Sequence, residues 1–566
     1  ISYKKEPASS AGSFFARLHL MHDRIRTAVE DALRTLGAEG TSFAVEWPAD
    51  LAHGDFATNA ALAAAKALGK NPKEVAESLV PLIHESLGDL VTSVEVAGPG
   101  FVNIRLAPST VTEIITNAAK DAGWGKGDAQ IGERVMVEYS CPNPFKEMHI
   151  GHLMSTVIGE AVARVTENTG ADVLRDSYGG DVGPHVAKAL WGLREKGITE
   201  PTTAKEQGDA YAHGSRAYEE SPEAKAEIDA LNRAIYDGTD RELMELWRKG
   251  KDVSLAAFRE LYRILDTHFD YYFFESETAA PGIEAVRRHI GDVFEESEGA
   301  VIYRGEKKGL HTLVFITSQG TPTYETKEIG LAYVKEERAA TDTVLILTAA
   351  EQIGHFRVVH AALEDIAPLL GAKTTHIPHG FLRLTEGKMS SREGNVITAA
   401  GLIERVLERA SEKNADPLVA EQVAVGAIKY MILRQAPGGD IIFDEEKSLS
   451  LEGDSGPYLQ YARARALSVI SQADGSGEMS APENNYALEH LIVRFPEVAA
   501  RAARERAPHH VTQYLTQLAS AWNSFYAEER IRGGEHEVYK LRVAQAFVNT
   551  MTRGLWLLGI PTPDKM

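Results

Sequence analysis

The sequence predicts an α/β protein in which a parallel, doubly wound sheet follows a small α+β module and precedes an all-helical bundle. Three observations lead to this prediction. Short apolar runs that indicate strands alternate with helical periodicity across residues 135–348. Strand and helix patterns are mixed over roughly the first hundred residues, the size of a small domain. From residue 456 to 566 the apolar positions recur at helical spacing only.

The first module begins with a long amphipathic pattern at residues 11–36, which glycines at 37 and 40 end. Its apolar face is expected to consist of Phe14, Phe15, Leu18, Ile25, Val29 and Leu33. Strands are expected at 42–47, 93–97 and 100–106, and a second helix is expected to open at 53–59. Asn71 followed by proline predicts the capped start of a third helix. We therefore expect an α+β domain over residues 1–110.

The sheet domain is expected to span residues 111–440. Its predicted strands are the apolar runs at 135–139, 172–177, 313–317 and 343–348. A charged, helical stretch at 195–265 indicates an insertion between the halves of the sheet, with most charges on a solvated face. Helices at 401–409 and 417–433 lead into a helical domain over residues 441–566.

Composition excludes several classes of protein. The 566 residues are 44% apolar and 25% charged, and no apolar run approaches the ~18 residues of a membrane span. The net charge of −21 argues against nonspecific nucleic-acid binding but is compatible with a specific RNA partner held by a local basic patch. The single cysteine, Cys141, excludes an internal disulfide and a thiolate-rich zinc site, which favours the cytoplasm. No secretory signal is evident, and the sequence leaves open whether residues precede Ile1.

The first chemical motif lies directly after the strand at 135–139. Pro142 and Pro144 prevent a helix, and helical spacing begins after His152. His149 and His152 are three residues apart in the first turn of that helix, so both rings should lie on one face. A helix N-terminus is a ready site for phosphate, and Gly151 would let a base or sugar approach the backbone. The residues alone leave open that these are two surface histidines.

The second motif, Gly387-Lys388-Met-Ser-Ser-Arg-Glu-Gly394, follows a strand-like stretch at 375–384. A lysine on such a glycine-bracketed loop can swing onto a polyphosphate and neutralise charge that develops during nucleotidyl transfer. Taken alone, Lys388 is compatible with a solvated surface lysine. The chain contains neither a G-x-G-x-x-G dinucleotide fingerprint nor a G-x-x-x-x-G-K-[ST] phosphate loop, so a nucleotide must be held in another way.

The two motifs together resemble those of class I aminoacyl-tRNA synthetases. The first resembles the arginyl-tRNA synthetase form, in the stretch that begins Ser140-Cys-Pro-Asn-Pro-Phe-Lys-Glu-Met-His and ends at residue 159. Residues 180–183, 320–324, 352–356 and 451–461 resemble further motifs of that family. The resemblance runs from about residue 14 to the end. It implies a Rossmann-like catalytic domain at 111–440, an N-terminal additional domain that recognises the tRNA elbow, and a C-terminal anticodon-binding domain.

The resemblance also implies roles for individual residues. The catalytic group consists of His149, His152, Lys146 and Lys388. The ATP-binding group consists of His149, Gly151, His152, Gly180, His355, Lys388, Met389, Ser390 and Ser391. ATP is the implied nucleotide, with Mg²⁺ bound to it and no zinc. Met154 and Ser391 replace residues that are basic in many relatives, and Cys141 stands where the family usually has serine.

An arginine pocket needs acids, because guanidinium is a permanently charged, planar fork of donors that carboxylates accept. The implied arginine-binding residues are Glu138, Asn143, Glu275, Tyr324, Glu328 and Gln352. Three of them are carboxylates. Glu328 departs from the aspartate usual in the family, and its extra methylene moves the charge by roughly 1.5 Å. That departure motivates the hypothesis of altered amino-acid specificity.

The implied tRNA-binding residues are Phe101, Asn103, Tyr458, Tyr461, Tyr526 and Met566. An exposed aromatic can stack on a base and an amide can recognise a base edge. The bundle also interleaves basic residues with these aromatics and Phe525, namely Arg463, Arg465, Arg494, Arg501, Arg504, Arg506, Arg530 and Arg532. Each aromatic taken alone is equally compatible with a core position.

The resemblance therefore predicts a cytoplasmic, monomeric enzyme that joins L-arginine to tRNA(Arg) with ATP, and whose activation step needs bound tRNA. Two alternatives stay open at this stage. One is the same fold charging another amino acid, and the other is a catalytically silent tRNA-binding relative.

Overall fold

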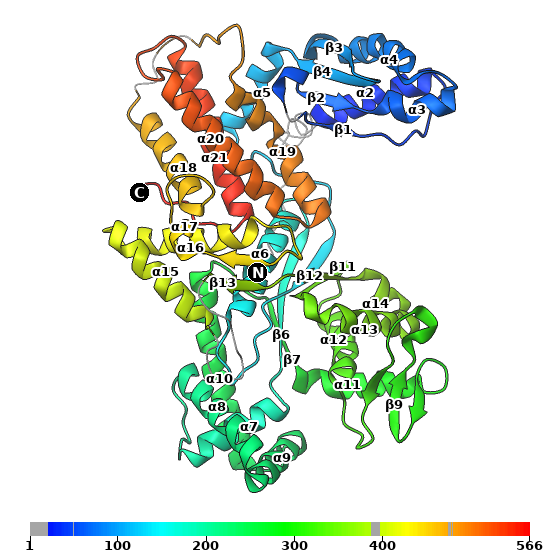
Figure 1. Cartoon of the computed structure of the whole chain (residues 1–566), viewed down its shortest axis with the longest axis vertical. Coiled ribbons are helices and arrows are strands. Elements are labelled where there is room, and N and C mark those ends of the chain that lie inside the picture. Colours follow the sequence, from blue (N-terminus) through cyan, green and yellow to red (C-terminus); the bar gives the residue numbers. More distant parts are fainter. Residues whose placement is uncertain (1–20, 49, 386–396, 474–476, 478) are drawn as a thin grey trace, which may run out of the picture.

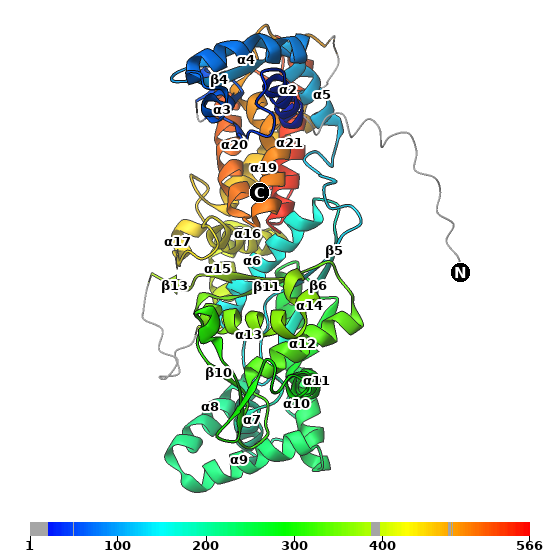
Figure 2. The same ribbon diagram turned by 90° about the vertical axis from the view of Figure 1, so that its right-hand side faces the viewer.

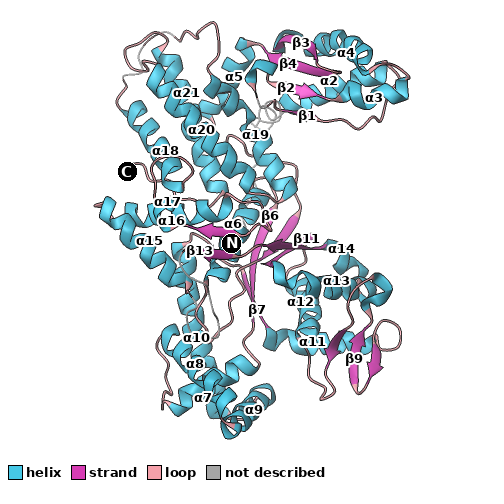
Figure 3. Cartoon of the chain, in the orientation of Figure 1, coloured by secondary structure: helices cyan, strands magenta, loops and turns pink. Residues whose placement is uncertain are grey.

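The computed structural model describes residues 21–48, 50–385, 397–473, 477 and 479–566. A five-stranded parallel sheet of order β12-β11-β5-β6-β7 lies near the middle of an elongated molecule (Figure 1 and Figure 3). Its strands are β5 (Arg134–Glu138), β6 (Asp172–Gly179), β7 (Tyr271–Phe274), β11 (Thr343–Ala349) and β12 (Thr374–His379). The predicted α/β class with a parallel sheet is confirmed.

Helices cover both faces of this sheet, because alternate strand residues point to opposite sides. Val135 and Val137 belong to the apolar cluster that includes α6 (Ile150–Glu167), whereas Met136 packs in the cluster that includes α12 (Tyr324–Arg338). The first strand, β5, is central, and the chain extends the sheet to β6 and β7 on one side and to β11 and β12 on the other. Such a change of direction creates a crevice at the carboxyl ends of the strands, where ligands bind in open α/β sheets.

The prediction for residues 313–317 was wrong in one respect. These residues form β10 (Leu313–Ile316), but β10 pairs antiparallel with β9 (Ala300–Tyr303) in a separate sheet completed by β8 (Glu295–Ser297). The connections between these strands are short, whereas a parallel neighbour requires a crossover of about a dozen residues or more. The outer position in the parallel sheet belongs to β7, which the sequence analysis did not identify.

The N-terminal module has a four-stranded antiparallel sheet of order β1-β2-β4-β3 with helices against it. Its elements are α2 (Met21–Thr35), β1 (Val45–Glu46), β2 (Phe56–Thr58), α3 (Ala60–Leu68), α4 (Pro72–Leu87), β3 (Val91–Ala97) and β4 (Phe101–Leu106). The strand β2 lies where the second helix was expected to open. The predicted cap of the third helix is confirmed, since the Asn71 side chain accepts a hydrogen bond from the Lys73 amide. Phe14, Phe15 and Leu18 lie outside the described residues.

The stretch at 195–265 is largely helical, as expected, but it connects the neighbouring strands β6 and β7 and does not separate the two halves of the sheet. It lies at one end of the molecule, opposite the N-terminal module and the bundle (Figure 2). It consists of α8 (Ala204–Glu220), α9 (Pro222–Asp237) and α10 (Arg241–Ile264), which follow α7 (Pro184–Glu195). The helices beside the small sheet are α11 (Glu275–Arg288), α13 (Ile353–Ile366) and α14 (Pro368–Lys373).

The C-terminal part is helical, as predicted. After the pair β13 (Leu382–Leu384) and β14 (Ile441–Phe443), its helices are α15 (Ala399–Lys413), α16 (Pro417–Leu433), α17 (Glu445–Ser448), α18 (Gly456–Ser471), α19 (Ala487–Glu505), α20 (His509–Glu528) and α21 (Glu537–Leu557). The helix α21 packs against α5 (Pro108–Lys120), and Trp124 donates from Nε1 to the Ile492 carbonyl at 3.3 Å. Among the described helices, none has the length and apolar character needed to cross a membrane.

Candidate active site

The carboxyl ends of the parallel strands bring the predicted site residues to one edge of the sheet. Glu138 is the last residue of β5, Glu275 follows β7 directly, and Gln352 lies in the short turn after β11. Gly180 follows β6, and its amide donates to Asn143 Oδ1 at 2.8 Å. A Cβ at Gly180 would lie 2.8 Å from that oxygen and 3.2 Å from Glu275 Oε1. These elements therefore form one wall of a shared crevice.

The loop between β5 and α6 is held in a strained conformation. Three non-glycine residues have left-handed backbone angles, with φ of 71° at Ser140, 51° at Cys141 and 67° at Phe145. Such strain is costly and clusters at functional sites. Phe145 is fully buried, and its amide donates to Ser254 Oγ of the inserted helices at 2.9 Å. Packing thus fixes the course of the loop.

Cys141 is a packed residue in this loop. Its Sγ accepts from the Tyr178 amide at 3.5 Å. Burial raises the pKa of its thiol well above the usual value, and the nearby Glu138 carboxylate adds to the effect. The thiol is therefore protonated at neutral pH, which is the wrong state for a nucleophile.

The two histidines start helix α6, as predicted, and they cap it. His149 Nδ1 accepts from the Gly151 amide at 3.1 Å, and His152 Nδ1 accepts from the His149 amide at 3.3 Å. The rings stack with centroids 3.8 Å apart. Because both Nδ1 atoms accept, both protons reside on Nε2. The site thus presents two neutral Nε2–H donors side by side.

This arrangement differs from the expected phosphate site at open amides. The amides of the first turn already have partners, since the Ile150 N–H donates to Ile397 O and the His152 N–H to His149 O. A Cβ at Gly151 would lie 2.8 Å from Cε1 of His149, so the missing side chain makes room for that ring and not for a base or sugar. The donors available to a phosphate are therefore the ring Nε2–H groups.

The environment keeps both imidazoles neutral. Burial lowers the pKa of His149, with a further contribution from Lys146. Burial lowers the pKa of His152 further, and His149, Lys146 and His379 act in the same direction. Lys146 lies with its Nζ 4.4 Å from the centre of the Tyr211 ring on α8. The Lys146 ammonium is therefore close enough to both neutral imidazoles to influence their protonation.

Residues next to the second motif are hydrogen-bonded to the first. The Ile150 amide donates to Ile397 O at 3.2 Å, and the Ala399 amide donates to Met148 O at 2.8 Å. His149 and Thr398 form an antiparallel bridge. Lys388, Met389, Ser390 and Ser391 lie outside the described residues. Residues 397–399, which follow them in the chain, nevertheless lie beside the two histidines.

The acids predicted for the amino-acid pocket lie close together and are mostly paired. Lys335 forms ion pairs with Glu138 and, at 2.8 Å, with Asp176. Lys327 Nζ lies 2.6 Å from Glu275 Oε2. Glu328 is 5% exposed and its Oε1 has no hydrogen-bond partner within the described part of the chain. Burial raises the pKa of Glu328 to about 8, and the Glu138 carboxylate adds to the shift.

Tyr324 at the start of α12 packs against His355 of α13, close to Glu328. Their ring centroids are 4.7 Å apart. His355 Nδ1 lies 3.3 Å from Glu325 Oε1, and its Nε2 is buried without a partner among the described residues. Burial raises the pKa of the Tyr324 phenol well above its usual value, and Glu328 adds to that shift. The phenol is thus a neutral donor.

Three residues of this pocket were missed by the sequence analysis: Asp176, Lys327 and Lys335. Asp176 lies within β6, where it pairs with Glu138 of β5. Lys335 is seven residues after Glu328 on α12, which puts both on one helical face. That spacing could have indicated Lys335, but nothing in the sequence separates a buried lysine from a surface one.

The residues predicted to contact tRNA lie in two separate regions. Phe101 of β4 is 41% exposed, which excludes a core position, and Asn103 is partly exposed on the same strand. Tyr461 and Met566 are 38% and 37% exposed, and Tyr458 and Tyr526 are partly buried. Tyr526 lies under the guanidinium of Arg465, 4.0 Å from its ring centre.

Other members of the basic–aromatic group have structural roles. Phe525 is buried. Arg463 is also buried and donates to the carbonyls of Thr562 and Pro563. Arg494 lies over the Trp47 ring and donates to Pro48 O in the N-terminal module. Some of the eight arginines therefore take part in packing and are not free to contact an RNA loop.

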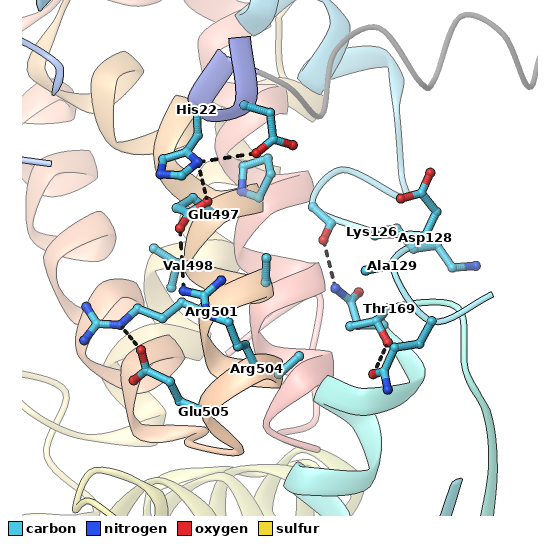
Figure 4. A pocket seen from close by; sticks show the side chains of 18 of the residues that line it. His22, Lys126, Asp128, Ala129, Thr169, Glu497, Val498, Arg501, Arg504 and Glu505 are labelled. Carbon is cyan, nitrogen blue, oxygen red and sulfur yellow. Dashed lines mark hydrogen bonds and ion pairs between the residues drawn. The ribbon is translucent and has the colours of Figure 1, made fainter. Parts of the chain in front are cut away.

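A large cavity lies away from this site. It has a volume of about 1180 Å³ and lies between α2, α19 and the amino ends of β5 and β11, as Val135 and Thr343 in its lining indicate. Its charged lining includes Glu497, Arg501 and Arg504 of α19 (Figure 4). Of the predicted catalytic, ATP-binding and arginine-binding residues that the structure describes, none lines it.

Comparisons with known proteins agree with this geometry. Three family models match: "Arginyl tRNA synthetase N terminal domain" over residues 23–106, "tRNA synthetases class I (R), catalytic domain" over 111–445, and "DALR anticodon binding domain" over 459–566. The chain is 30% identical to an arginine–tRNA ligase of Fusobacterium nucleatum, over 91% of this chain and 93% of the relative. It is also 30% identical to one of Cellvibrio japonicus, over 96% and 100%. Among solved structures, it matches Thermus thermophilus arginyl-tRNA synthetase with a TM-score of 0.80 and 27% identity, over 97% of this chain and 100% of that one.

Proposed function

Since the chain belongs to the arginyl-tRNA synthetase family of class I, we propose that it activates L-arginine with ATP and transfers it to the 3′ end of tRNA(Arg). The observation that carries this proposal is the convergence of two distant segments. The turn with His149 and His152 is hydrogen-bonded to residues 397–399, and the acids of the pocket lie at the same edge of the sheet.

In the first step, the arginine carboxylate attacks the α-phosphorus of ATP and pyrophosphate leaves from the opposite side. The Nε2–H groups of His149 and His152 donate to phosphate oxygens as charge develops on them. Lys146 and Lys388 add positive charge. Catalysis by preorganised donors and cations is worth several kcal/mol without any covalent step by the protein.

Mg²⁺ belongs to the proposal as the ion that accompanies the ATP phosphates and screens their charge. Within the described ranges, no group of three or more acidic, histidine or cysteine side chains is suited to holding a metal ion. The phosphates themselves are therefore the expected main ligands. This fits the preference of Mg²⁺ for one or two carboxylates plus substrate phosphates.

In the second step, a hydroxyl of the terminal ribose attacks the adenylate carbonyl and AMP leaves. Phe101 and Asn103 would contact the tRNA elbow, and Tyr458, Tyr461, Tyr526 and Met566 the anticodon loop. As in the family that the sequence resembles, activation is proposed to require bound tRNA. The cytoplasm is the proposed compartment and a monomer the proposed working unit, which gel filtration tests.

A charging assay with purified protein, ATP, Mg²⁺ and tRNA(Arg) tests the proposal. Arginine should be joined to tRNA, whereas lysine and citrulline should not. ATP–pyrophosphate exchange should be absent until tRNA is added. Charging of lysine or citrulline in place of arginine would support altered specificity, and tRNA binding without any charging would indicate a silent relative.

A further inference from the structure

The helical insertion reaches the proposed phosphate site through one aromatic side chain. Tyr211 of α8 lies under the Lys146 ammonium, whose Nζ is 4.4 Å from the centre of the ring. This distance is typical of a cation–π contact, in which the negative face of the ring attracts the charge. Lys146 comes three residues before His149. The insertion therefore contacts the loop that leads into the two histidines.

The Tyr211 ring can orient this cation without neutralising it. Among the residues that the structure describes, no carboxylate lies within ion-pair distance of Lys146. By contrast, Lys327 and Lys335 of α12 are both paired with acids. A carboxylate would cancel much of the charge that a lysine can offer to a polyphosphate, whereas a neutral ring leaves that charge available.

The position of Tyr211 is fixed through the same hydroxyl that fixes the loop. The Phe145 amide donates to Ser254 Oγ at 2.9 Å, and this hydroxyl donates to Gln207 Oε1 at 2.5 Å. Gln207 is four residues before Tyr211 on α8, so both side chains lie on one face of that helix. The residue before Lys146 and the helix that carries its aromatic partner are therefore bonded to one serine.

Close packing against α7 holds α8 on both sides of the ring (Figure 1). A Cβ at Gly192 of α7 would lie 2.1 Å from Ala210 O. A Cβ at Gly214 of α8 would lie at the same distance, 2.1 Å, from Lys188 O. The two helices therefore approach to backbone contact, and the Tyr211 ring packs on the apolar cluster of the inserted helices. Since the ring has little freedom to move, the flexible lysine side chain takes its position from the ring.

We propose that Tyr211 is a positioning residue for the activation step: its ring holds the Lys146 ammonium beside the two histidines, where charge develops on the phosphates of ATP. The inference rests on the function proposed above. Preorganised cations stabilise a transition state because they need not reorganise during the reaction. An ammonium on an unsupported four-carbon stem would lose this advantage, since the stem occupies many rotamers. The insertion thus contributes to catalysis without touching the substrate.

ATP–pyrophosphate exchange with tRNA present measures the activation step. Tyr211→Leu removes the ring, and the exchange rate at saturating substrates should fall about 5- to 30-fold, the upper range for a cation–π contact. The KM for ATP should change less than about threefold, because the groups that bind ATP remain. Tyr211→Phe keeps the ring and should keep at least about half of the wild-type rate. A phenylalanine variant as slow as the leucine variant would contradict a role for the ring.

A double-mutant cycle shows whether the loss depends on Lys146. In the Lys146→Met background, adding Tyr211→Leu should lower the exchange rate less than about twofold, because no ammonium remains to be positioned. A loss as large as in the wild-type background would overturn the inference, since Tyr211 would then act on the fold or on a substrate. An unchanged or faster exchange in Tyr211→Leu alone would do the same, since the lysine would then leave the ring before reaction. Tyr211→Met repeats the comparison should the leucine variant fold poorly.

Tyr218→Leu provides a matched control. Tyr218 lies seven residues after Tyr211 on α8, and the Lys188 ammonium lies 4.5 Å from its ring centre. Neither member of this second pair belongs to the loop before the histidines, so the exchange rate should stay within about twofold of wild type. An equal loss in Tyr218→Leu would assign the effect to helix packing and contradict the inference. If the wild-type protein charges no arginine, the proposed function fails; if it charges arginine but the cycle shows no coupling, only the inference fails.

Discussion

The backbone N–H of Ile150 donates to the carbonyl of Ile397 over 3.2 Å, so the helix that begins with the two histidines is joined to the chain that follows the predicted signature loop. A second bond, from the Ala399 amide to Met148 O at 2.8 Å, fixes the register of this contact. The two motifs are more than 200 residues apart in sequence. The segment that directly follows Lys388 and its neighbours in sequence is therefore fixed beside the proposed phosphate site.

Substitution of His152 tests the role of this turn. His152→Ala removes one neutral Nε2–H donor and the acceptor that caps the His149 amide. Turnover should fall by about two orders of magnitude or more, the usual loss for one preorganised donor to the transition state. Affinity for tRNA, measured by filter binding, should change less than about threefold, because the predicted tRNA contacts lie elsewhere. An unchanged turnover would remove the histidine pair from the mechanism.

A buried ion network stabilises the same helix further along. Glu160 on α6 pairs with Arg164 at 2.6 Å and with Arg175 at 3.0 Å, and it accepts from the Tyr139 hydroxyl at 2.6 Å. Although burial disfavours its ionised form, Arg164 and Arg175 outweigh that effect and lower the pKa of Glu160 to about 2.

Glu160→Gln should therefore lower the free energy of unfolding by about 3–5 kcal/mol, because it leaves two buried guanidinium groups short of a counter-ion. Urea unfolding followed by circular dichroism measures this loss. Glu167→Gln is the matched control. Glu167 also pairs with Arg175, but its side chain is 43% exposed, so its removal should cost less than about 1 kcal/mol. Equal losses of unfolding free energy in both variants would mean that burial does not determine how much each ion pair contributes to stability.

The sequence predicted most of the sheet but few of the charge pairs. The strands at 135–139, 172–177 and 343–348 were correctly identified, because strands covered on both faces appear as apolar runs. The short aromatic strand β7 was missed because it directly follows the long helix α10 and a brief turn. Of the acids at the proposed site, Glu138, Glu275 and Glu328 were predicted from the family resemblance. Their partners Lys327 and Lys335 were not, because burial of a helical lysine is decided by tertiary packing.

The exposed aromatic Phe101 gives a prediction for the N-terminal module. If its ring stacks on a tRNA base, Phe101→Ala should weaken tRNA binding by roughly 1–3 kcal/mol, the range for one base–aromatic stack, without lowering the melting temperature. Leu369→Ala provides a control, because Leu369 is an exposed apolar residue on α14, far from this module in the chain. Unchanged tRNA affinity of Phe101→Ala would exclude the stacking role.

The last prediction concerns the pH dependence of arginine recognition. Burial, reinforced by the Glu138 charge, raises the pKa of Glu328 to about 8, so in the free pocket this carboxyl is mainly protonated at pH 7. Guanidinium needs the ionised form. Binding must therefore release a proton below pH 8, and the KM for arginine should fall up to about tenfold per unit as the pH rises from 6 to 8 and then level off.

Other groups that titrate nearby can be separated by substitution. Burial raises the pKa of Asp176 to about 7, with Glu138 adding to the effect and Lys335 opposing it. Burial lowers the pKa values of His149 and His152, which favours their neutral forms. Glu328→Gln should raise the KM for arginine and make it nearly independent of pH. If Asp176 were the titrating group, the KM of the Glu328→Gln variant would still depend on pH. Steady-state charging at pH 6.0–8.5 distinguishes the two groups, with the KM for ATP as the internal control. A KM for arginine that does not change with pH in the wild-type protein would show that Glu328 is already ionised before arginine binds.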